Sequence, residues 1–358
     1  MIRGANMGSG RYVSGEFAHV SEEKFARDLA RNSATPRDII YTQRGTLGQV
    51  AIVPVGGPDT YVVSQSQMRL RVDPDRAVPE FVYYASTTDD FLRQIQDRAI
   101  STGVPHTNLG ILGELEIPLP PVRQQQAIAE VLGALDDKIA ADITLADAAE
   151  SVAIATVATL ASTVPLATIA WLRRDQLAPA ALGDVRVHHF SLPAFDVDRR
   201  PSLESAQDIK SAKFVLNSPV VLLSKLNPRF PRVWRASPVE SHRALASTEF
   251  LVLEPNATSP GLLWASLSQP NVTRSLESQV SGTSGSHQRV RPSDVLATPV
   301  IDVRSAPERL RVAVEASLKL ADLARVEIAT LAEMRTALIP HLMSGKLSVR
   351  DALSAAGT

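Results

Sequence analysis

The residues with the clearest capacity for chemistry lie in one basic segment, residues 225–235. Two prolines stiffen this segment, so its side chains lose less conformational entropy when they bind a ligand. Long cationic side chains on such a loop suit phosphate groups and the edges of guanine bases. The segment therefore predicts a DNA-binding loop, although an ordinary solvated hairpin loop is the alternative. Its candidate DNA-binding residues are Lys225, Asn227, Arg229, Arg232 and Arg235.

A second segment, residues 281–291, combines glycine and hydroxyl side chains with basic and amide side chains. Small residues leave backbone N–H groups accessible, and turns of this kind bind phosphate. A solvated loop without a ligand explains this segment about equally well. Its candidate DNA-binding residues are Ser286, His287, Gln288 and Arg289.

Catalytic motifs are missing from the sequence. There is no G-x-x-x-x-G-K-[ST] loop, which argues against a nucleotide-driven motor. The run N-P-R-F at residues 227–230 is close to the Asn-Pro-Pro-aromatic segment of amino-methyltransferases, but arginine replaces the second proline and no glycine-rich cofactor loop precedes it. Residues 58–59 are not followed by the Glu-x-Lys of a nuclease, and the adjacent His188 and His189 would point to opposite faces of a strand. We therefore expect no enzyme activity, no metal site and no cofactor.

Composition narrows the class of protein. The chain has 358 residues, of which 44% are hydrophobic, and this length suffices for two domain cores. It has no cysteine, which excludes disulfides and thiolate metal sites, and the residues near Met1 lack the order of a signal peptide. We therefore expect a reducing, cytoplasmic setting.

The net charge of −1 conceals two segments of opposite charge. Residues 210–243 hold seven basic residues and one acid, a net charge of +6 that suits a polyanion. Residues 121–150 have a net charge of −4, and we expect this acidic segment to face away from DNA and to bind a protein partner. Two solvated surfaces are the alternative. The candidate partner-binding residues are Asp136, Asp137 and Asp142.

Apolar residues spaced three and four apart predict two long helices. The first begins after Pro121, and the second begins after Pro307 and ends near Pro340. Each has a polar opposite face, so the simplest arrangement packs them together as a coiled-coil pair. The alternative is that each helix packs only on its own neighbouring domain.

Residues 151–172 carry no charge, and on length alone such a stretch suits a membrane helix. However, it consists mostly of Ala, Thr, Ser and Val, and Pro165 interrupts it. We interpret it as the end of a buried helix followed by the first strand of a new domain, so no membrane partner is expected.

The segments that precede the two helices are alike, and this duplication is the most informative feature of the sequence. His106 and His287 are 181 residues apart, and so are Pro118 and Pro299. The order along the chain is therefore globular domain, helix, globular domain, helix.

The duplication extends upstream to an apolar strand that runs into a basic loop. Residues 38–45 match residues 219–226 at nearly the same separation. This match adds Gln43 and Arg44 to the candidate DNA-binding residues. Both globular domains alternate short β-like runs with turns, and the clearest runs are residues 49–53, 61–63, 214–223 and 250–253.

Several separate motifs, in order along the chain, closely resemble those of type I restriction-modification specificity subunits. The first domain contributes residues 44–54 and 117–128 to this resemblance, the second contributes residues 223–234, 246–250 and 282–290, and the C-terminal helix contributes residues 338–347. The resemblance implies an α+β fold with two β-rich target-recognition domains, each followed by a long helix, and an antiparallel coiled coil of the two helices. The implied segments are the first recognition domain (residues 1–120), the first helix (121–162), the second recognition domain (163–306), the second helix (307–347) and a tail (348–358).

The implied function is a non-catalytic subunit that recognises a split target in double-stranded DNA. In the family the paired helices act as a ruler between the two half-sites and as the docking surface for methyltransferase subunits. The partners would therefore be DNA, methyltransferase subunits and restriction/translocase subunits. By the offset of 181, Met1 aligns near Leu182, so the first domain is expected to lack a counterpart of roughly residues 164–182.

Three other functions remain open at this stage. The chain could be a fused methyltransferase or nuclease, which would require the motifs that are missing. It could be the recognition subunit of a different phage-defence methylase, or a degenerate scaffold whose first domain no longer reads a half-site.

Overall fold

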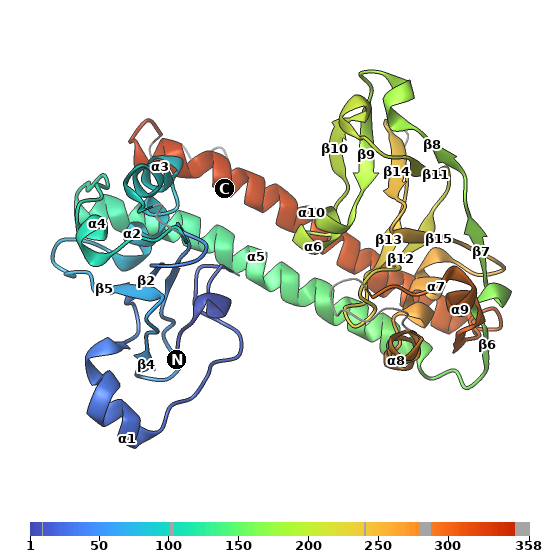
Figure 1. Ribbon diagram of the computed structural model, residues 1–358, viewed down its shortest axis with the longest axis horizontal. Coiled ribbons are helices and arrows are strands. Elements are labelled where there is room, and N and C mark those ends of the chain that lie inside the picture. Colours follow the sequence, from blue (N-terminus) through green and yellow to red (C-terminus); the bar gives the residue numbers. More distant parts are fainter. Residues whose placement is uncertain (9, 101–103, 240, 280–287, 348–358) are drawn as a thin grey trace. The chain divides into compact units, whose positions relative to one another are not determined.

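The computed structural model describes residues 1–8, 10–100, 104–239, 241–279 and 288–347. It divides into two compact units: unit 1 comprises Met1–Ile143 and Arg325–Thr358, and unit 2 comprises Thr144–Ala324. The long helices α5 (Val122–Val157) and α10 (Glu308–Met343) each contribute one part to each unit (Figure 1). Neither these helices nor any other helix in the described ranges is both long and apolar enough to cross a membrane.

Unit 1 is built on a small antiparallel sheet with the strand order β3-β2-β5, beside the two-stranded pair β1-β4. The strands are β1 (Ser33–Ala34), β2 (Ile39–Thr42), β3 (Val50–Ile52), β4 (Tyr61–Val62) and β5 (Gln67–Leu70). The helices are α1 (Glu22–Lys24), α2 (Pro79–Ala85), α3 (Asp89–Arg98) and α4 (Leu109–Gly113).

Strand β2 separates two cores of unit 1, because alternate side chains of a strand point to opposite faces. Ile39 and Tyr41 pack with Phe81 and with Leu132 of α5, whereas Ile40 packs on the other face with Ala51. Every residue of β2 is buried, which explains why its sequence reads as a continuous apolar run.

Unit 2 contains two larger sheets, with the strand orders β10-β9-β14-β11-β8 and β13-β12-β15-β7, and the pair β16-β6. The strands are β6 (Thr163–Pro165), β7 (Ala170–Arg173), β8 (Gln176–Leu177), β9 (Arg186–Phe190), β10 (Ser202–Ser205), β11 (Lys213–Leu216), β12 (Val220–Ser224), β13 (Val233–Ala236), β14 (Arg243–Ser247), β15 (Phe250–Pro255) and β16 (Pro299–Ile301). The helices are α6 (Leu192–Val197), α7 (Pro260–Leu267), α8 (Pro270–Ser278) and α9 (Pro292–Ala297). The run predicted at residues 214–223 thus forms most of two strands, β11 and β12, rather than one.

The two long helices pack against each other in an antiparallel manner within each unit. In unit 2, Ala146 and Ala149 of α5 contact Ala321 and Ala324 of α10, and the absence of long side chains lets the two backbones approach closely. In unit 1, Asp136 of α5 pairs with Arg335 of α10, and Lys138 of α5 pairs with Glu327 of α10. Residue numbers therefore fall along α10 as they rise along α5. The predicted antiparallel coiled coil is therefore confirmed. Each helix also enters the core of both units, but the alternative that each helix packs only on its own neighbouring domain is wrong.

The two units repeat the same elements, but the register derived from the sequence is wrong by one residue. Ile39 and Tyr41 face the helix side of their sheet, and so do Val221 and Leu223, which gives an offset of 182 for this strand. The sequence alignment had placed Ile39 opposite Val220, which faces the other core. A slip of one residue exchanges the two faces of a strand, and sequence similarity between two fully apolar strands does not detect it.

The beginning of unit 1 also differs from the sequence alignment. Ile2 forms a parallel bridge with Val63, and Phe190 forms the corresponding parallel pair with Ala246 of β14. Ile2 is therefore equivalent to Phe190, and the alignment of Met1 with Leu182 is wrong. The described residues of unit 1 contain no strand equivalent to β6, β7 or β8.

Candidate nucleic-acid interface

Gln43 and Lys225 occupy equivalent positions, directly after β2 and β12. The backbone N–H of Gln43 donates to Ser66 O (2.8 Å), and the backbone N–H of Lys225 donates to Glu249 O (2.9 Å). The carbonyl of each accepts a further backbone hydrogen bond at 3.0 Å, from Thr107 in unit 1 and from Val290 in unit 2. The same backbone frame therefore presents an amide side chain in unit 1 and an ammonium group in unit 2.

The loop that follows each of these residues turns through a left-handed backbone conformation two residues later. Gly45 has φ of 106° and Asn227 has φ of 49°. Glycine and asparagine are the residue types that adopt this conformation most readily. The Asn227 amide donates to Gln288 O (2.9 Å), and an isolated bridge joins Leu226 to Arg289. These contacts bring two separately predicted DNA-binding segments together in unit 2.

Lys225 lies in a small group of charged residues. Arg289 pairs with Glu249 through Nη2 and Oε1 at 2.9 Å. Burial lowers the pKa of the Lys225 ammonium, the Glu249 carboxylate opposes this effect, and the Arg289 charge adds to it. Lys225 is half-buried and Arg289 is exposed, and both charges act near the Glu249 carboxylate.

Arg229 is the most accessible cation of the basic loop. It is exposed and makes no ion pair within the ranges that the structure describes, and its guanidinium lies 5.9 Å from the ring centroid of Phe230. Phe230 is itself 64% exposed, an unusual state for a large aromatic side chain. An exposed arginine beside an exposed ring can both contact phosphate and stack on a base.

Arg232 and Arg235 are committed to partners in their own unit. Arg232 binds Asp196 with two hydrogen bonds (2.6 and 2.9 Å), and Arg235 binds Asp322 with two (2.8 and 2.7 Å). Lys213, which the charge count included in the basic segment, is buried and donates to Ser211. The segment of net charge +6 is therefore not one continuous cationic surface.

Unit 1 has a cleft of about 610 Å³ beside β5, lined by both polar and apolar side chains. Amide side chains and two arginines line it: Gln43, Gln65, Gln67, Asn32, Asn108, Arg31 and Arg69. Amides and guanidiniums are the groups that pair with the edges of adenine and guanine. Sequence analysis identified only Gln43, because the others come from separate segments that carry no local motif. Arg44 is exposed and forms an isolated bridge with His106.

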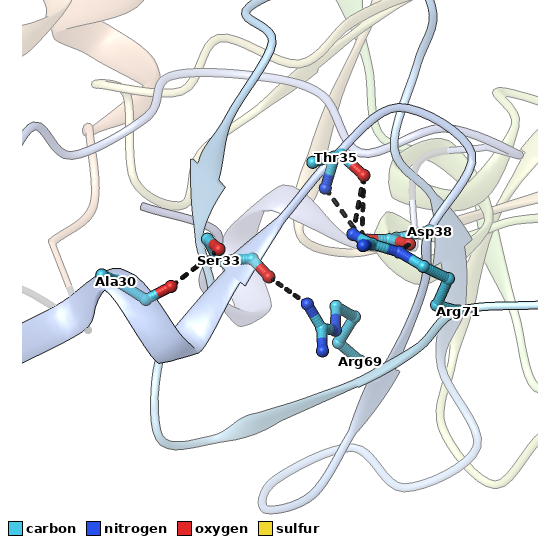
Figure 2. Close-up of polar contacts among 6 residues, drawn as sticks. All are labelled: Ala30, Ser33, Thr35, Asp38, Arg69 and Arg71. Atoms are coloured by element: carbon cyan, nitrogen blue, oxygen red, sulfur yellow. Dashed lines mark hydrogen bonds and ion pairs between the residues drawn. The ribbon is translucent and has the colours of Figure 1, made fainter.

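The arginines of β5 and of the segment after it are held in place by local hydrogen bonds (Figure 2). Arg69 Nη1 donates to Ser33 O (2.6 Å). Arg71 donates twice to the buried Asp38 carboxylate, at 2.7 Å each, and the Thr35 amide donates to the same carboxylate at 2.8 Å. Burial would raise the pKa of Asp38, but these hydrogen bonds outweigh it and lower that pKa.

The three candidate partner-binding aspartates do not form one exposed face. Asp137 is 70% exposed and pairs with Arg11, whereas the side chains of Asp136 and Asp142 are only 9% and 4% exposed. Asp136 accepts hydrogen bonds from Tyr84 Oη (2.7 Å) and Arg335 Nη1 (2.6 Å). The alternative of a solvated acidic surface is therefore wrong for two of the three residues, because basic and phenolic groups of unit 1 cover them. Binding of a partner by these residues stays a prediction.

Two of the predicted DNA-binding residues, Ser286 and His287, lie outside the described residues. Their neighbour Gln288 is half-buried and Arg289 is exposed. The rings of His188 and His242 lie in contact, with 5.2 Å between their centroids. A hydrogen bond of 2.8 Å joins His189 Nδ1 to the Glu204 carboxylate. Over the described part of the chain, no group of three or more His, Asp or Glu residues is arranged to hold a metal ion.

Comparison with known proteins finds a family match for part of the chain. Residues 29–146 match the family described as "Type I restriction modification DNA specificity domain". The matched residues amount to about a third of the chain and lie in unit 1 and the first part of α5. For these residues, the resemblance found from the sequence motifs is confirmed. The match covers β1 to β5, α2 to α4 and the first part of α5, and it includes every residue that lines the cleft of unit 1.

Two known proteins are similar to parts or to the fold of this chain. The "Type I restriction enzyme MjaIX specificity subunit" of Methanocaldococcus jannaschii is 28% identical over 117 residues, which is 33% of this chain and 26% of that protein. The match thus covers about a quarter of the length of this relative. The crystal structure of the type I restriction-modification system S subunit from M. genitalium matches with a TM-score of 0.54 and 14% identity, over 96% of this chain and 91% of that one. At this identity the match establishes the fold alone.

Proposed function

We propose that this chain is a DNA-recognition subunit that reads a target of two half-sequences, one with each unit. The observation that carries the proposal is the repeated frame around Gln43 and Lys225, in which the same backbone hydrogen bonds present different side chains. Two copies of one frame with different chemistry suit two different short sequences. The amide-lined cleft in unit 1 and the exposed Arg229 in unit 2 supply the groups that contact bases and phosphates.

The proposed assembly includes methyltransferase subunits and restriction subunits, which would carry out the chemistry. The lack of catalytic motifs in the sequence favours this division of labour over an enzyme activity of the chain itself. Of the acidic residues, Asp137 is the accessible candidate for a contact with the methyltransferase subunit. Its exposed carboxylate lies on α5, the element that the family resemblance assigns to partner docking.

The experiment maps the bases that a reconstituted complex with a methyltransferase subunit modifies in genomic DNA. Two double variants are compared, Gln43→Ala with Arg44→Ala in unit 1 and Lys225→Ala with Arg229→Ala in unit 2. We expect the first variant to relax only one half-sequence and the second to relax only the other. A lost bidentate base contact costs about 1–3 kcal/mol, or roughly 5- to 150-fold in discrimination.

Arg232→Ala is the matched control, because it removes a cation from the same loop that is already bound to Asp196. It should leave both half-sequences unchanged. Relaxation of both half-sequences by either double variant would contradict the assignment of one half to each unit. An unaltered site for the unit 1 variant would instead identify unit 1 as a scaffold that does not read DNA.

A further inference from the structure

The loop that joins β12 to β13 in unit 2 is anchored at both ends. The backbone N–H of Ser224 donates to Arg232 O (3.0 Å), which closes the loop of residues 225–231. On one side, the backbone N–H groups of Lys225 and Asn227 donate to neighbouring segments at 2.9 Å each. On the other side, the Arg232 side chain makes two hydrogen bonds to a carboxylate of α6. The base of the loop therefore has little freedom to move.

The loop tip, residues 229–231, is short and stiff. Of the loop residues, all of which the structure describes, only these three are exposed, and Pro228 beside them is buried. The backbone N–H of Phe230 donates to Asn227 O (2.9 Å), and Asn227 adopts the left-handed conformation that this turn requires. Pro228 and Pro231 fix their own φ angles on either side of Phe230. The tip is thus held in one conformation before any ligand binds, which limits the entropy lost on binding.

Phe230 projects from this tip without a packing role in its own unit. Its side chain is 64% exposed, and it belongs to none of the hydrophobic clusters formed by the described residues. A phenyl ring has no hydrogen-bonding group, so it gains free energy only when a partner removes it from water. The ring is therefore available to a ligand and is not needed for folding.

The charges around the ring favour a polyanion as that ligand. In the described part of the chain, neither Lys225 nor Arg229 makes an ion pair, whereas Arg232 and Arg289 each pair with a carboxylate. Two uncompensated cations therefore belong to the same loop as Phe230. Charged residues are depleted at the centre of protein–protein interfaces, but they bind the phosphates of DNA. A base stack between phosphate backbones offers both kinds of contact that the tip can make.

Unit 1 has no such tip. A backbone hydrogen bond from Thr42 to Gln49 (3.0 Å) closes the equivalent loop, residues 43–48. The one large apolar side chain of that loop, Leu47, packs against the core of unit 1. The exposed residues there are Arg44, Gly45 and Thr46. The exposed ring is therefore a feature of unit 2 and not of the frame that the two units share.

We propose that Phe230 inserts between two stacked base pairs of DNA and unstacks them, while Arg229 contacts a neighbouring phosphate. The inference rests on the proposed function and deepens it, because it gives unit 2 a way to read the deformability of its target. Apolar wedges such as Phe partly unstack a base step and kink the duplex by about 20–90°. Pyrimidine–purine steps, TA and CA/TG, are unstacked most easily. We therefore expect such a step within or beside the half-sequence that unit 2 reads.

Three variants separate insertion from other roles of an exposed ring. Phe230→Ala removes the wedge, and Phe230→Leu keeps an apolar wedge of a kind that DNA-kinking proteins also use. Trp171→Ala is the matched control. Trp171 is 51% exposed and its ring centroid lies 5.8 Å from the guanidinium of Arg173, but it lies on strand β7 and Arg173 is paired with Glu254. Thermal unfolding of each variant shows that it is folded.

The test uses the complex assembled with a methyltransferase subunit and a duplex that contains the mapped target. 2-Aminopurine, whose fluorescence rises when it is unstacked, replaces one purine at a time. The base that the methyltransferase subunit modifies stays unlabelled, because such enzymes flip that base themselves. We expect a rise at one step for the unaltered chain, Phe230→Leu and Trp171→Ala, and no rise for Phe230→Ala.

Affinity and site preference should change together with this signal. Phe230→Ala should weaken DNA binding by about 5- to 150-fold, the range for the loss of one stacking contact between an aromatic side chain and a base. Methylation mapping with this variant should also show a relaxed preference for the pyrimidine–purine step. Trp171→Ala should change neither quantity.

Three results would overturn the proposal. Unchanged affinity for Phe230→Ala would show that the ring does not contact DNA. Weaker affinity without a fluorescence rise at any labelled purine in the unaltered complex would show contact without insertion. Loss of the methyltransferase subunit from the Phe230→Ala complex would identify the ring as a protein contact.

Failure of the proposed function gives a different result. In that case the double variant Lys225→Ala with Arg229→Ala would leave both methylated half-sequences unaltered, and the wedge would fall with it. If the double variant relaxes one half-sequence but no step is unstacked, unit 2 reads DNA and only the insertion of Phe230 is wrong.

Discussion

The basic loop of unit 2 contains two arginines that make opposite predictions for DNA binding. Arg229 is exposed and has no ion pair within the described ranges, whereas Arg232 is held by Asp196 through two hydrogen bonds. They are three residues apart and chemically identical. Arg229→Ala and Arg232→Ala therefore form a matched pair in which only the availability of the guanidinium differs.

The salt dependence of DNA affinity measures that availability. Each phosphate contact that is lost removes about 0.9 from the slope of log affinity against log salt concentration. Between 50 and 200 mM salt, a fourfold change, one contact corresponds to a factor of about 3.5. Arg229→Ala should therefore weaken binding about 3.5 times more at 50 mM than at 200 mM salt. Arg232→Ala should leave the slope unchanged and cost about 1 kcal/mol of stability, the value of a partly exposed ion pair.

The assay is fluorescence anisotropy of a labelled duplex that contains the mapped target, titrated with the assembled complex at four salt concentrations. Thermal unfolding of each variant runs in parallel, so that a loss of folded protein is not mistaken for a loss of contact. Equal slopes for Arg229→Ala and the unaltered chain would refute a phosphate contact by Arg229. A reduced slope for Arg232→Ala would show that DNA displaces Asp196, and the distinction drawn from the ion pair would fail.

Three further predictions concern unit 1. Asp136→Asn should lower the free energy of unfolding by about 3 kcal/mol, because it leaves Arg335 and Tyr84 without their buried carboxylate partner. The same substitution at the exposed Asp137 should lower it by at most about 1 kcal/mol, and urea unfolding measures both changes. Asp38→Asn should be destabilising at pH 7, because the lowered pKa of Asp38 means that its carboxylate stabilises the folded chain. The difference should begin to shrink as the pH falls below about 4, the pKa of an aspartate in the unfolded chain, and should disappear only below the lowered pKa of the folded state. Gln43→Lys should shift one position of the first half-sequence from adenine towards guanine in methylation mapping, because amides pair with adenine and lysine with guanine.

Periodicity and repetition in the sequence predicted much of the fold. The apolar stripes placed both long helices to within a few residues at their N-termini, because Pro121 and Pro307 mark the starts and the spacing of apolar residues persists for the whole helix. The repeat predicted two similar units. The strand runs at residues 49–53, 61–63 and 250–253 correspond to β3, β4 and β15. These features depend on local patterns, which a single sequence contains in full.

Features that depend on distant partners were not predictable in this way. The charge count treated Arg232, Arg235 and Lys213 as one cationic surface, but their partners come from α6, from α10 and from the backbone beside Lys213. The charge count of α5 did not show that Tyr84 and Arg335 cover Asp136, because these residues are distant from it in the sequence. The cleft of unit 1 escaped notice because its amides are spread from residue 32 to residue 108.

The internal repeat also explains why the candidate site is easier to recognise in unit 2 than in unit 1. Lys225 belongs to a dense basic motif, whereas its equivalent Gln43 is one amide among several that the fold assembles from separate segments. Backbone hydrogen bonds preserve the frame in both units, so evolution can change the side chain it presents without changing the fold. A motif search detects the charged version of the frame and misses the neutral one. The equivalence of the two positions follows from the backbone bonds to Ser66 and Glu249, and these bonds are visible only once the strands are paired.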